Sequence, residues 1–436
     1  MTVSDTATIQ IEPARALVGH VALPGDKSIS HRAVLLGSVA EGPVEITGFG
    51  RAGDTESTVR AARSLGVDVE EPDVDRLVVH GRGLRGLKAP LSPIDCGNAG
   101  TLMRLLAGLL AGQRERFELT GDPSLNRRPM ERVAEPLRAL GARVETTDGH
   151  APLSVEGGDL TAIRYELPVP SAQVKSAILL AGLFAAGKTT VVERVPTRDH
   201  TELLLEQAGV DIQRRAAEIT VTPVESIDLE RVDIPGDFSS AAPLLVAATL
   251  LSGSELYVHN VGVNPTRTGL LDVLERMRAR VTVFNRRRLG HEAVADLEVR
   301  SSSLLVATAI EPDEIPRLVD ELPLVALTAG LARGETVIRG AGELRLKETD
   351  RLENVKDVLK PLGIRIAVDG DTLRIKGVPA RPKGGGVAHS DGDHRMAILA
   401  AVAGLVSRAG VRVEGAEAAA ISFPGFFELL ESVAKR

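Results

Sequence analysis

The sequence predicts an α/β protein built from six similar segments, and three observations support this prediction. First, an Ala/Leu-rich helical run followed by a small-residue turn and a β-branched strand recurs six times. Second, these six strands are spaced roughly evenly along the chain. Third, a second helix follows five of the six strands. Together the segments nearly fill the 436 residues. The six runs occupy residues 30–48, 101–121, 171–193, 239–260, 321–340 and 393–415.

The two helices of each segment differ in hydrophobic pattern. The first is apolar nearly all round, which predicts a buried helix. The second repeats apolar residues at i, i+3, i+4 and i+7, as in Val133, Leu137 and Leu140, which predicts a helix with one face buried. Each segment therefore reads as strand, buried helix, strand, surface helix and further strands. One ring of six and two groups of three fit this periodicity equally well. The surface helices are expected within 54–66, 127–141, 198–209, 264–277 and 347–363.

Polar and charged residues gather where the buried helices begin. A helix start presents unpaired N–H groups and the positive end of the helix dipole, so it attracts anions. Asp237 and Ser239 are explained as ordinary N-caps. Cations at such a start oppose the dipole, so they imply a negative ligand or a carboxylate nearby. These cations are Lys27, Arg32, Arg104, Lys175 and Arg395.

Two segments match nucleotide-binding patterns by their letters. Gly182–Thr189 fits the P-loop, but here a helix is expected to end at Gly187 and a strand to begin at Thr189, which reverses the P-loop order and makes Gly187 a helix C-cap. Gly81–Gly86 fits G-x-G-x-x-G, but Pro90 and Pro93 exclude the helix that should follow, so we expect a turn. Neither segment predicts nucleotide binding.

The sequence gives little support to metal or disulfide chemistry. The single cysteine, Cys96, excludes internal disulfides and multi-cysteine metal sites and fits a reducing compartment. The cluster of His389, Asp391, Asp393 and His394 lacks further convergent ligands, so we favour a structural role for it.

Composition excludes several classes of partner. A net charge of −7, 2% aromatic residues and no Trp argue against a nucleic-acid binder. The N-terminus has no basic segment followed by an apolar one, and runs such as Leu244–Leu251 are too short to span a bilayer. We therefore expect a cytoplasmic protein with neither nucleic-acid nor membrane partners.

Three motifs are specific enough to indicate a family. LPGDKSISHRAVLLGSVAEG from Leu23, DCGNAGTLMRLLAG from Asp95 and RLKETDRLENV from Arg345 closely resemble 5-enolpyruvylshikimate-3-phosphate synthases. The motifs GDKS, SAQVK, RDHTE and NPTR resemble the class II branch, whose members are often glyphosate-tolerant. Tolerance is a hypothesis here, because Gly100 is retained where tolerant enzymes often carry Ala.

The resemblance implies two similar domains, each of three βαβαββ units in an inside-out α/β barrel, with the active site in the cleft between them. It places one domain at 25–235 and a discontinuous second domain at 1–24 plus 236–436. The implied reaction transfers the enolpyruvyl group of phosphoenolpyruvate to the 5-hydroxyl of shikimate 3-phosphate and releases phosphate, in the biosynthesis of chorismate and the aromatic amino acids. No metal or organic cofactor is implied, and we expect a monomer whose partners are these two small molecules.

The resemblance also assigns the ligands of each substrate. Two matches to the family pattern are imperfect, because Ile421 stands where many relatives have Lys and Glu343 where they have Asn. Shikimate 3-phosphate is assigned to Lys27, Ser28, Arg32, Ser171, Ala172, Gln173, Arg198, Asp320 and Lys347, and phosphoenolpyruvate to Lys27, Gly100, Arg128, Gln173, Arg351 and Arg395.

The charges and the chemistry agree with this set. Each substrate carries a phosphate of about −1.5 to −2 and a carboxylate, which the cationic ligands can balance, so we predict that the cleft closes on binding. Carboxylates and lysines can exchange the required protons. Asp320 is expected to act as base toward the hydroxyl, Glu348 as acid and base at the methylene carbon, and Lys27 as proton donor or charge stabiliser.

Three rival readings are less favoured. The sister enolpyruvyl transferase acting on UDP-N-acetylglucosamine shares the six-unit fold, but its opening motif is rich in amides and lysines and it usually has a loop cysteine. A P-loop nucleotide-binding protein requires the opposite helix–strand order at Gly182–Thr189. A non-catalytic anion-binding homologue would not need Asp320 and Glu348.

Overall fold

The computed structural model describes residues 7–436, and the chain divides into two compact units. One, here called the 25–235 unit, comprises Gly25–Pro235 together with Arg288–Glu292. The other, the 236–436 unit, comprises the chain up to Pro24, Gly236–Arg287 and Ala293–Arg436. Each has its own hydrophobic core, built largely from Ala, Val, Leu and Ile.

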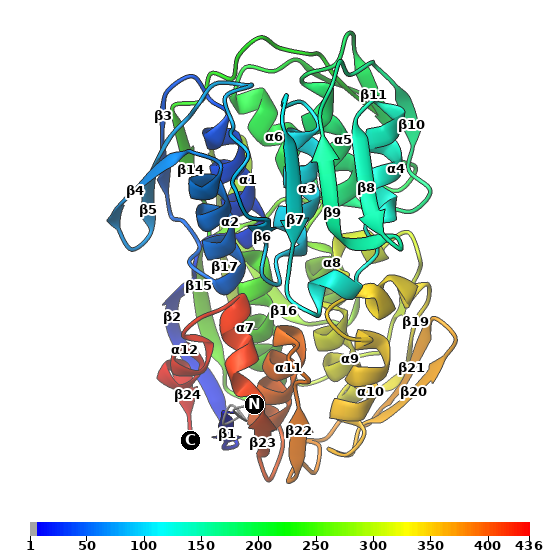
Figure 1. Ribbon diagram of the computed structural model, residues 1–436. Coiled ribbons are helices and arrows are strands. Elements are labelled where there is room, and N and C mark those ends of the chain that lie inside the picture. The colour runs from blue at the N-terminus through cyan, green and yellow to red at the C-terminus, as the bar shows by residue number, and fades with distance from the viewer. Residues whose placement is uncertain (1–6) are drawn as a thin grey trace. The chain divides into compact units, whose positions relative to one another are not determined.

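The 25–235 unit contains three sheets with one shared strand order (Figure 1). In each, two parallel strands are followed by two antiparallel ones. The sheets are β14 (Arg231–Asp233), β3 (Pro43–Thr47), β5 (Arg76–His80) and β4 (Asp68–Asp73); β6 (Ile94–Asp95), β7 (Arg116–Thr120), β9 (His150–Glu156) and β8 (Arg143–Thr147); and β10 (Arg164–Glu166), β11 (Thr189–Val192), β13 (Glu218–Val221) and β12 (Ile212–Arg215).

Buried and surface helices alternate along this unit. The buried helices are buried along almost their whole length, so their packing against one another and the sheets forms the core. They are α1 (Lys27–Ser38), α3 (Gly100–Leu110) and α5 (Ala172–Gly182), and the surface helices are α2 (Gly53–Ser64), α4 (Glu131–Ala139) and α6 (His200–Gln207), with a short 3-10 helix, η1, at Leu125–Arg127.

The 236–436 unit repeats this plan with small differences at its sheet edges. Its sheets are β16 (Arg280–Leu289), β17 (Glu292–Arg300), β15 (Glu255–Gly262), β2 (Ala16–Ala22) and β24 (Ala434–Lys435); β18 (Ala309–Ile310), β19 (Gly334–Ile338), β21 (Thr372–Gly377) and β20 (Arg365–Asp369); and β1 (Thr8–Ile11), β23 (Val411–Glu414) and β22 (Val387–His389). Its helices are α7 (Phe238–Leu250), α8 (Gly269–Arg276), α9 (Leu322–Gly330), α10 (Arg351–Leu359), α11 (His394–Val406) and α12 (Phe426–Val433), with 3-10 helices at Ile315–Arg317, Ala341–Leu346 and Ala416–Ile421.

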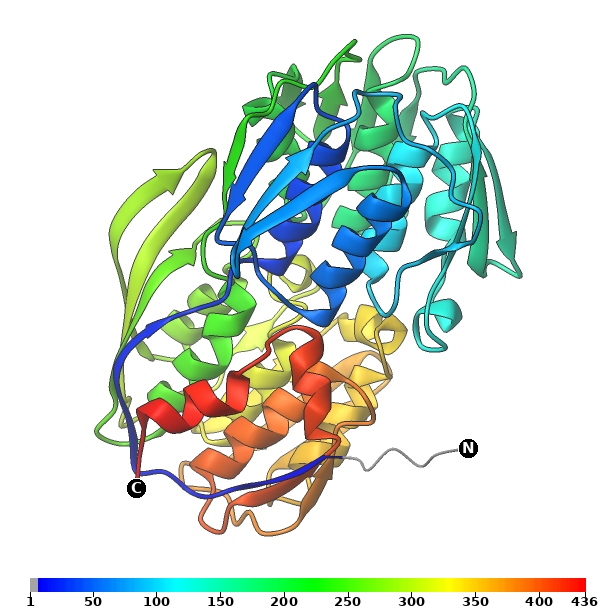
Figure 2. The same cartoon turned by 60° about the vertical axis from the view of Figure 1, so that its left-hand side comes forward.

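Strand exchange connects distant parts of the chain. The strand directly before α1 is β2, yet it pairs in parallel with β15, while the sheet that follows α1 takes β14 as its first strand. At the other end, β1 pairs antiparallel with β23 and completes the sixth sheet. Figure 2 shows these dark-blue N-terminal strands running beside the red and orange C-terminal segments of the same unit.

The predicted α/β fold of six similar segments is confirmed, and all eleven expected helices are present. The expected turn at Gly81–Gly86 is also confirmed, because no helix follows β5 before β6. One detail is wrong: α5 ends at Gly182 with Leu183 as its C-cap, so Gly187, with a φ of +120°, belongs to the turn before β11. Among residues 7–436, no helix is both long and apolar enough to cross a membrane.

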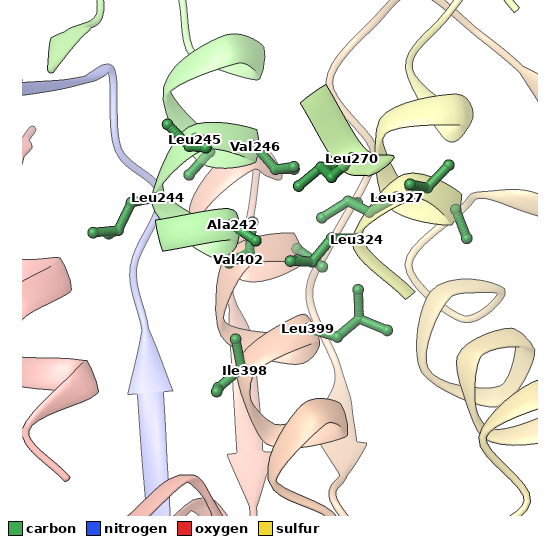
Figure 3. Packing of buried hydrophobic residues seen from close by; sticks show 14 of the residues in the cluster. Ala242, Leu244, Leu245, Val246, Leu270, Leu324, Leu327, Ile398, Leu399 and Val402 are labelled. Atoms are coloured by element: carbon green, nitrogen blue, oxygen red, sulfur yellow. The ribbon is translucent and has the colours of Figure 1, made fainter. Parts of the chain in front are cut away.

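Three buried helices, α7, α9 and α11, pack together as the centre of the 236–436 unit (Figure 3). Leu244 and Leu245 from α7, Leu324 and Leu327 from α9, and Leu399 from α11 are all less than 5% exposed. Ala-rich faces between these leucines allow the helices to approach closely. Stability of this unit therefore depends on the fit of a few leucines among small residues.

We expect Leu399→Ala to lower the free energy of unfolding by about 2–5 kcal/mol, because it removes a fully buried side chain and leaves a cavity. Denaturant unfolding followed by circular dichroism measures this change. Leu91→Ala is the control, since Leu91 is fully exposed and its truncation creates no cavity. Equal stability of the two variants would contradict the packing described.

Candidate active site

The first turn of α1 carries the first predicted ligand. Asp26 caps the helix by accepting a hydrogen bond from the backbone N–H of Ile29 at 2.9 Å. Lys27, the first helical residue, donates to Asp54 Oδ2 at 2.8 Å from the start of α2. This carboxylate is the counter-charge that a cation at a helix start requires.

Arg32 lies one turn further along α1 and is 3% exposed. Its guanidinium donates to the backbone carbonyl of Ser28 at 2.8 Å, to Thr201 Oγ1 at 2.7 Å and to Ser176 Oγ at 3.1 Å. Burial lowers the pKa of Arg32 to about 10, although the nearby Glu202 opposes this shift. Since all three acceptors are neutral oxygens, its charge remains available to an anionic ligand.

Helices α3 and α5 are joined by polar side chains near their N-termini. Arg104 of α3 donates to Gln173 Oε1 at 2.6 Å, and Gln173 in turn donates to Thr101 Oγ1 at 2.9 Å. Arg128, which follows η1, donates to Asn98 Oδ1 at 2.9 Å. Gln173 thus lies within one network with Arg104, although only Gln173 was assigned as a ligand.

Gly100 begins α3 between two of these arginines. A Cβ atom at this position would lie 3.0 Å from a terminal nitrogen of Arg104 and 3.0 Å from one of Arg128. Both distances are tighter than ordinary contacts, so the guanidinium groups would have to move. The absence of a side chain here therefore keeps both cations close to the start of the helix.

Helix α5 presents Ser171, Ala172 and Gln173 at its start, with Ser171 as the N-cap. Lys175 lies just beyond them and is fully buried between Glu193 and Glu202, at 2.8 Å and 2.7 Å. Of the two roles left open for this lysine, the structure shows pairing with carboxylates. Burial opposes the charged ammonium, but the two glutamates outweigh it and raise the pKa of Lys175.

In the 236–436 unit, the predicted residues gather around Arg351, the first residue of α10. Arg351 is 2% exposed and contacts Asp393 Oδ2 at 2.8 Å, Asp320 Oδ1 at 3.5 Å and the carboxylate of Glu348. Burial alone would lower the pKa of Arg351, but Asp393 and Glu348 outweigh it and raise that pKa. The structure therefore brings Asp320, Glu348 and Arg351 together as predicted.

Arg395 lies beside this group at the start of α11. It approaches Asp320 Oδ2 at 3.9 Å and Glu321 Oε1 at 3.8 Å. The fully buried Glu321 also accepts from Ser239 and lies 3.3 Å from Arg267. Asp320 therefore lies next to two cations, Arg351 and Arg395.

Lys347 follows the 3-10 helix Ala341–Leu346 and lies 3.8 Å from Glu343. A carboxylate, that of Glu343, therefore faces this lysine. Burial lowers the pKa of Lys347, although Asp320 and Glu343 oppose that shift. A lysine with a lowered pKa gives up its proton more readily, which suits proton transfer.

The cluster HSDGDH does not gather around one point. His389 is exposed and pairs with Glu414 at 3.2 Å, whereas Asp393 and His394 lie close to Glu348. That trio has the spacing of a metal site, but the guanidinium of Arg351 contacts all three groups. The positive charge next to these three side chains is thus that of an arginine. This arrangement agrees with the structural role expected for Asp393.

Comparison with known proteins identifies the family. The family model for EPSP synthase (3-phosphoshikimate 1-carboxyvinyltransferase) matches residues 11–430. The chain belongs to the EPSP synthase family. A 3-phosphoshikimate 1-carboxyvinyltransferase from Desulforudis audaxviator is 49% identical over 98% of this chain and 99% of the relative, and one from Halorhodospira halophila is 48% identical over 97% and 95%.

Solved structures agree with this membership. An EPSP synthase from Acinetobacter baumannii has a TM-score of 0.86 and 41% identity, and the match covers 98% of both chains. The enolpyruvyl transferase NikO from Streptomyces tendae has a TM-score of 0.79 at 20% identity over 98% of both chains, which shows a shared fold alone.

Several partners of the family residues were not found from the sequence. Asp54 holds Lys27, Thr201 and Ser176 hold Arg32, and Glu193 and Glu202 hold Lys175. The cations at helix starts indicated that negatively charged or polar partners must lie nearby. They did not indicate which residues those partners are. Arg267 and Thr201 lie within the motifs NPTR and RDHTE, but neither these motifs nor the residues Asp54 and Ser176 indicated which groups would pair.

We expect Asp393→Ala to lower the free energy of unfolding by about 3–5 kcal/mol, because it leaves Arg351 buried without its one fully buried carboxylate partner. Chemical denaturation measures the effect. Glu431→Ala serves as a control that removes an exposed ion pair with Arg436 and should change stability by less than about 1 kcal/mol. An Asp393→Ala protein as stable as this control would show that Arg351 does not depend on Asp393.

Proposed function

We propose that this chain is a 3-phosphoshikimate 1-carboxyvinyltransferase, which transfers the enolpyruvyl group of phosphoenolpyruvate to the 5-hydroxyl of shikimate 3-phosphate. The observation that carries this proposal is the full-length relationship to proteins of that name at 46–49% identity. The cationic helix starts of both units supply the charge that two phosphorylated carboxylates need. The products are 5-enolpyruvylshikimate 3-phosphate and phosphate.

The reaction requires protons to move at two places. A proton is added to the methylene carbon of phosphoenolpyruvate while the 5-hydroxyl loses its proton and attacks the neighbouring carbon, which gives a tetrahedral ketal. Loss of a methyl proton then expels phosphate and restores the double bond. Carboxylates next to cations can accept and return these protons.

Each catalytic role is assigned to a residue whose surroundings fit it. Asp320, held by Arg351 and approached by Arg395, acts as the base toward the hydroxyl. Glu348, paired with Arg351, exchanges the proton at the methylene carbon. Lys27, with its ammonium on Asp54, donates a proton or stabilises charge.

The proposed ligands come from both units, and they share a cationic or helix-start position. Shikimate 3-phosphate is assigned to Lys27, Ser28, Arg32, Ser171, Ala172, Gln173, Arg198, Asp320 and Lys347, and phosphoenolpyruvate to Lys27, Gly100, Arg128, Gln173, Arg351 and Arg395. The proposal requires that one active site lie between domains 25–235 and 1–24 plus 236–436. Closure of that site on ligand binding stays a prediction.

The remaining features follow from this assignment. The enzyme acts as a monomer in the cytoplasm on two small molecules, without nucleic acid and without a metal or organic cofactor. A P-loop function is not favoured, because α5 precedes Gly187 and β11 follows it. Class II membership and glyphosate tolerance stay predictions; potent inhibition by glyphosate that is competitive with phosphoenolpyruvate would contradict the tolerance.

We expect Asp320→Asn and Glu348→Gln each to lower kcat by about 10²–10⁴-fold, because each removes a proton-transfer group while keeping its shape. Phosphate release with both substrates measures turnover, and calorimetry checks that the variants still bind. Glu335→Gln, an exposed change on β19, is the control. Near-full turnover in a variant that binds both substrates would refute its assigned role.

We expect Gly100→Ala to raise the KM for phosphoenolpyruvate about tenfold, since the new methyl group would displace Arg128 and Arg104 and weaken a charge-assisted contact. The KM for shikimate 3-phosphate should change less. Gly42→Ala is the matched control in the same unit, because a Cβ there meets no atom within 4 Å. Unchanged kinetics in Gly100→Ala would remove Arg128 from the phosphoenolpyruvate site.

A further inference from the structure

A buried ionic cluster in the 25–235 unit has no part in the proposed chemistry. It consists of Lys175, Glu193 and Glu202. The Lys175 ammonium lies 2.8 Å from Glu193 Oε1, 2.7 Å from Glu202 Oε1 and 3.3 Å from the backbone carbonyl of Thr197. Lys175 has no exposed surface, and Glu202 is 1% exposed.

The repeated fold does not require this cluster. Lys175 is the fourth residue after the N-cap of α5, and the equivalent residues of the other five buried helices are neutral. Burying ions is costly, and a buried ion pair is often no more stable than an apolar replacement. The cluster therefore needs a reason beyond helix packing. The equivalent residues are Ser30, Met103, Ala241, Val325 and Ala397.

The cluster fastens one particular segment to α5. Glu193 follows β11 directly, and its Oε2 accepts from the backbone N–H and the hydroxyl of Thr197 at 3.2 Å and 2.7 Å. Glu202 lies in the first turn of α6. Both ends of segment 193–202 are thus held by a single ammonium group, and Arg198 lies between them.

The residues next to the cluster hold Arg32. Ser176 follows Lys175 and Thr201 precedes Glu202, and their hydroxyls are 2.7 Å apart. Arg32 donates to Thr201 at 2.7 Å and to Ser176 at 3.1 Å. When Lys175 draws Glu202 toward α5, it therefore also brings together the two hydroxyls that orient the Arg32 guanidinium.

We propose that Lys175, through Glu193 and Glu202, is a positioning residue for shikimate 3-phosphate. It fixes Arg198 and Arg32 relative to Ser171, Ala172 and Gln173, which begin the same helix. This inference rests on the proposed function, which assigns all five to that substrate. None of the three cluster residues needs to touch the substrate. Of the five positioned residues, only Gln173 is also assigned to phosphoenolpyruvate, so the cluster should matter more for shikimate 3-phosphate.

The test replaces the whole cluster, so that no buried charge is left unpaired. In Lys175→Met/Glu193→Gln/Glu202→Gln, we expect the KM and the calorimetric Kd for shikimate 3-phosphate to rise about 10–100-fold, the scale of a small misplacement of binding groups. The KM for phosphoenolpyruvate should rise by a smaller factor, because that substrate shares only Gln173 with the positioned set. Lys188→Met is the matched control, since Lys188 is an exposed lysine between α5 and β11 that pairs with Asp211 at 3.5 Å.

A purely structural role predicts a different result. It would lower the melting temperature of the triple variant while leaving both KM values unchanged, and that outcome overturns the proposal. An equal rise in both KM values also overturns it. If the triple variant does not fold, Glu202→Gln carries the test, because it keeps the Lys175–Glu193 pair and a hydrogen-bonding group. A selective rise in the KM for shikimate 3-phosphate supports the proposal, and an unchanged or unselective KM refutes it.

The wild-type arm separates this inference from the proposed function. If the wild type releases phosphate but the triple variant raises the two KM values equally or not at all, the positioning role alone is refuted. A wild type that binds shikimate 3-phosphate without turnover would refute the proposed function, and the Kd of the triple variant would still decide the positioning role. A wild type that neither turns over nor binds that substrate would overturn both.

Discussion

A buried positive charge near the start of a helix is the constraint on which the site depends. The helix dipole and the loss of water both disfavour it, so each such cation needs a partner with negative charge or free lone pairs. Lys27 meets this need with Asp54, Lys175 with two glutamates and Arg351 with three carboxylates. The partners differ, because these three cations face carboxylates whereas Arg32 donates to neutral oxygens.

Arg32 and Arg351 differ most in the charge of the groups that surround them. Arg351 is surrounded by Asp393, Glu348 and Asp320, so its charge orients carboxylates as much as it attracts a ligand. Arg32 is equally buried but donates to neutral oxygens, and its lowered pKa records the cost of keeping the charge there. An anion bound at Arg32 would offset the free-energy cost of burying its charge. Removing an acidic side chain from Arg351 would instead leave part of its buried charge unpaired. Arg32 is thereby suited to pair with an anion, whereas Arg351 holds acidic side chains in place.

The sequence predicted the helices and the strand of each segment because those depend on local periodicity. The pairing of β2 with β15 and of β14 with β3 did not follow from periodicity, since it joins strands that are far apart in the chain; the resemblance supplied the boundaries near Pro24 and Pro235. Partner residues were harder still. The misplaced charge of Lys175 was visible in the sequence, and Glu202 lies in the motif RDHTE. Nothing in the sequence showed that Glu193 and Glu202 would both pair with Lys175, because that requires β11 and α6 to fold against α5.

The two lysines nearest α5 show why position along a helix matters more than a motif. Lys188 completes a P-loop pattern, yet it lies beyond the C-terminal end of α5, where the dipole favours a cation, and its side chain is 51% exposed beside Asp211. Lys175 belongs to no nucleotide-binding pattern, but it lies near the N-terminal end, where the dipole opposes it and burial adds to the penalty. The helix dipole stabilises Lys188 at the C-terminal end, whereas at the N-terminal end two buried glutamates stabilise Lys175. Lys175, whose burial is energetically unfavourable, is therefore the lysine that contacts the segment carrying the proposed substrate ligands.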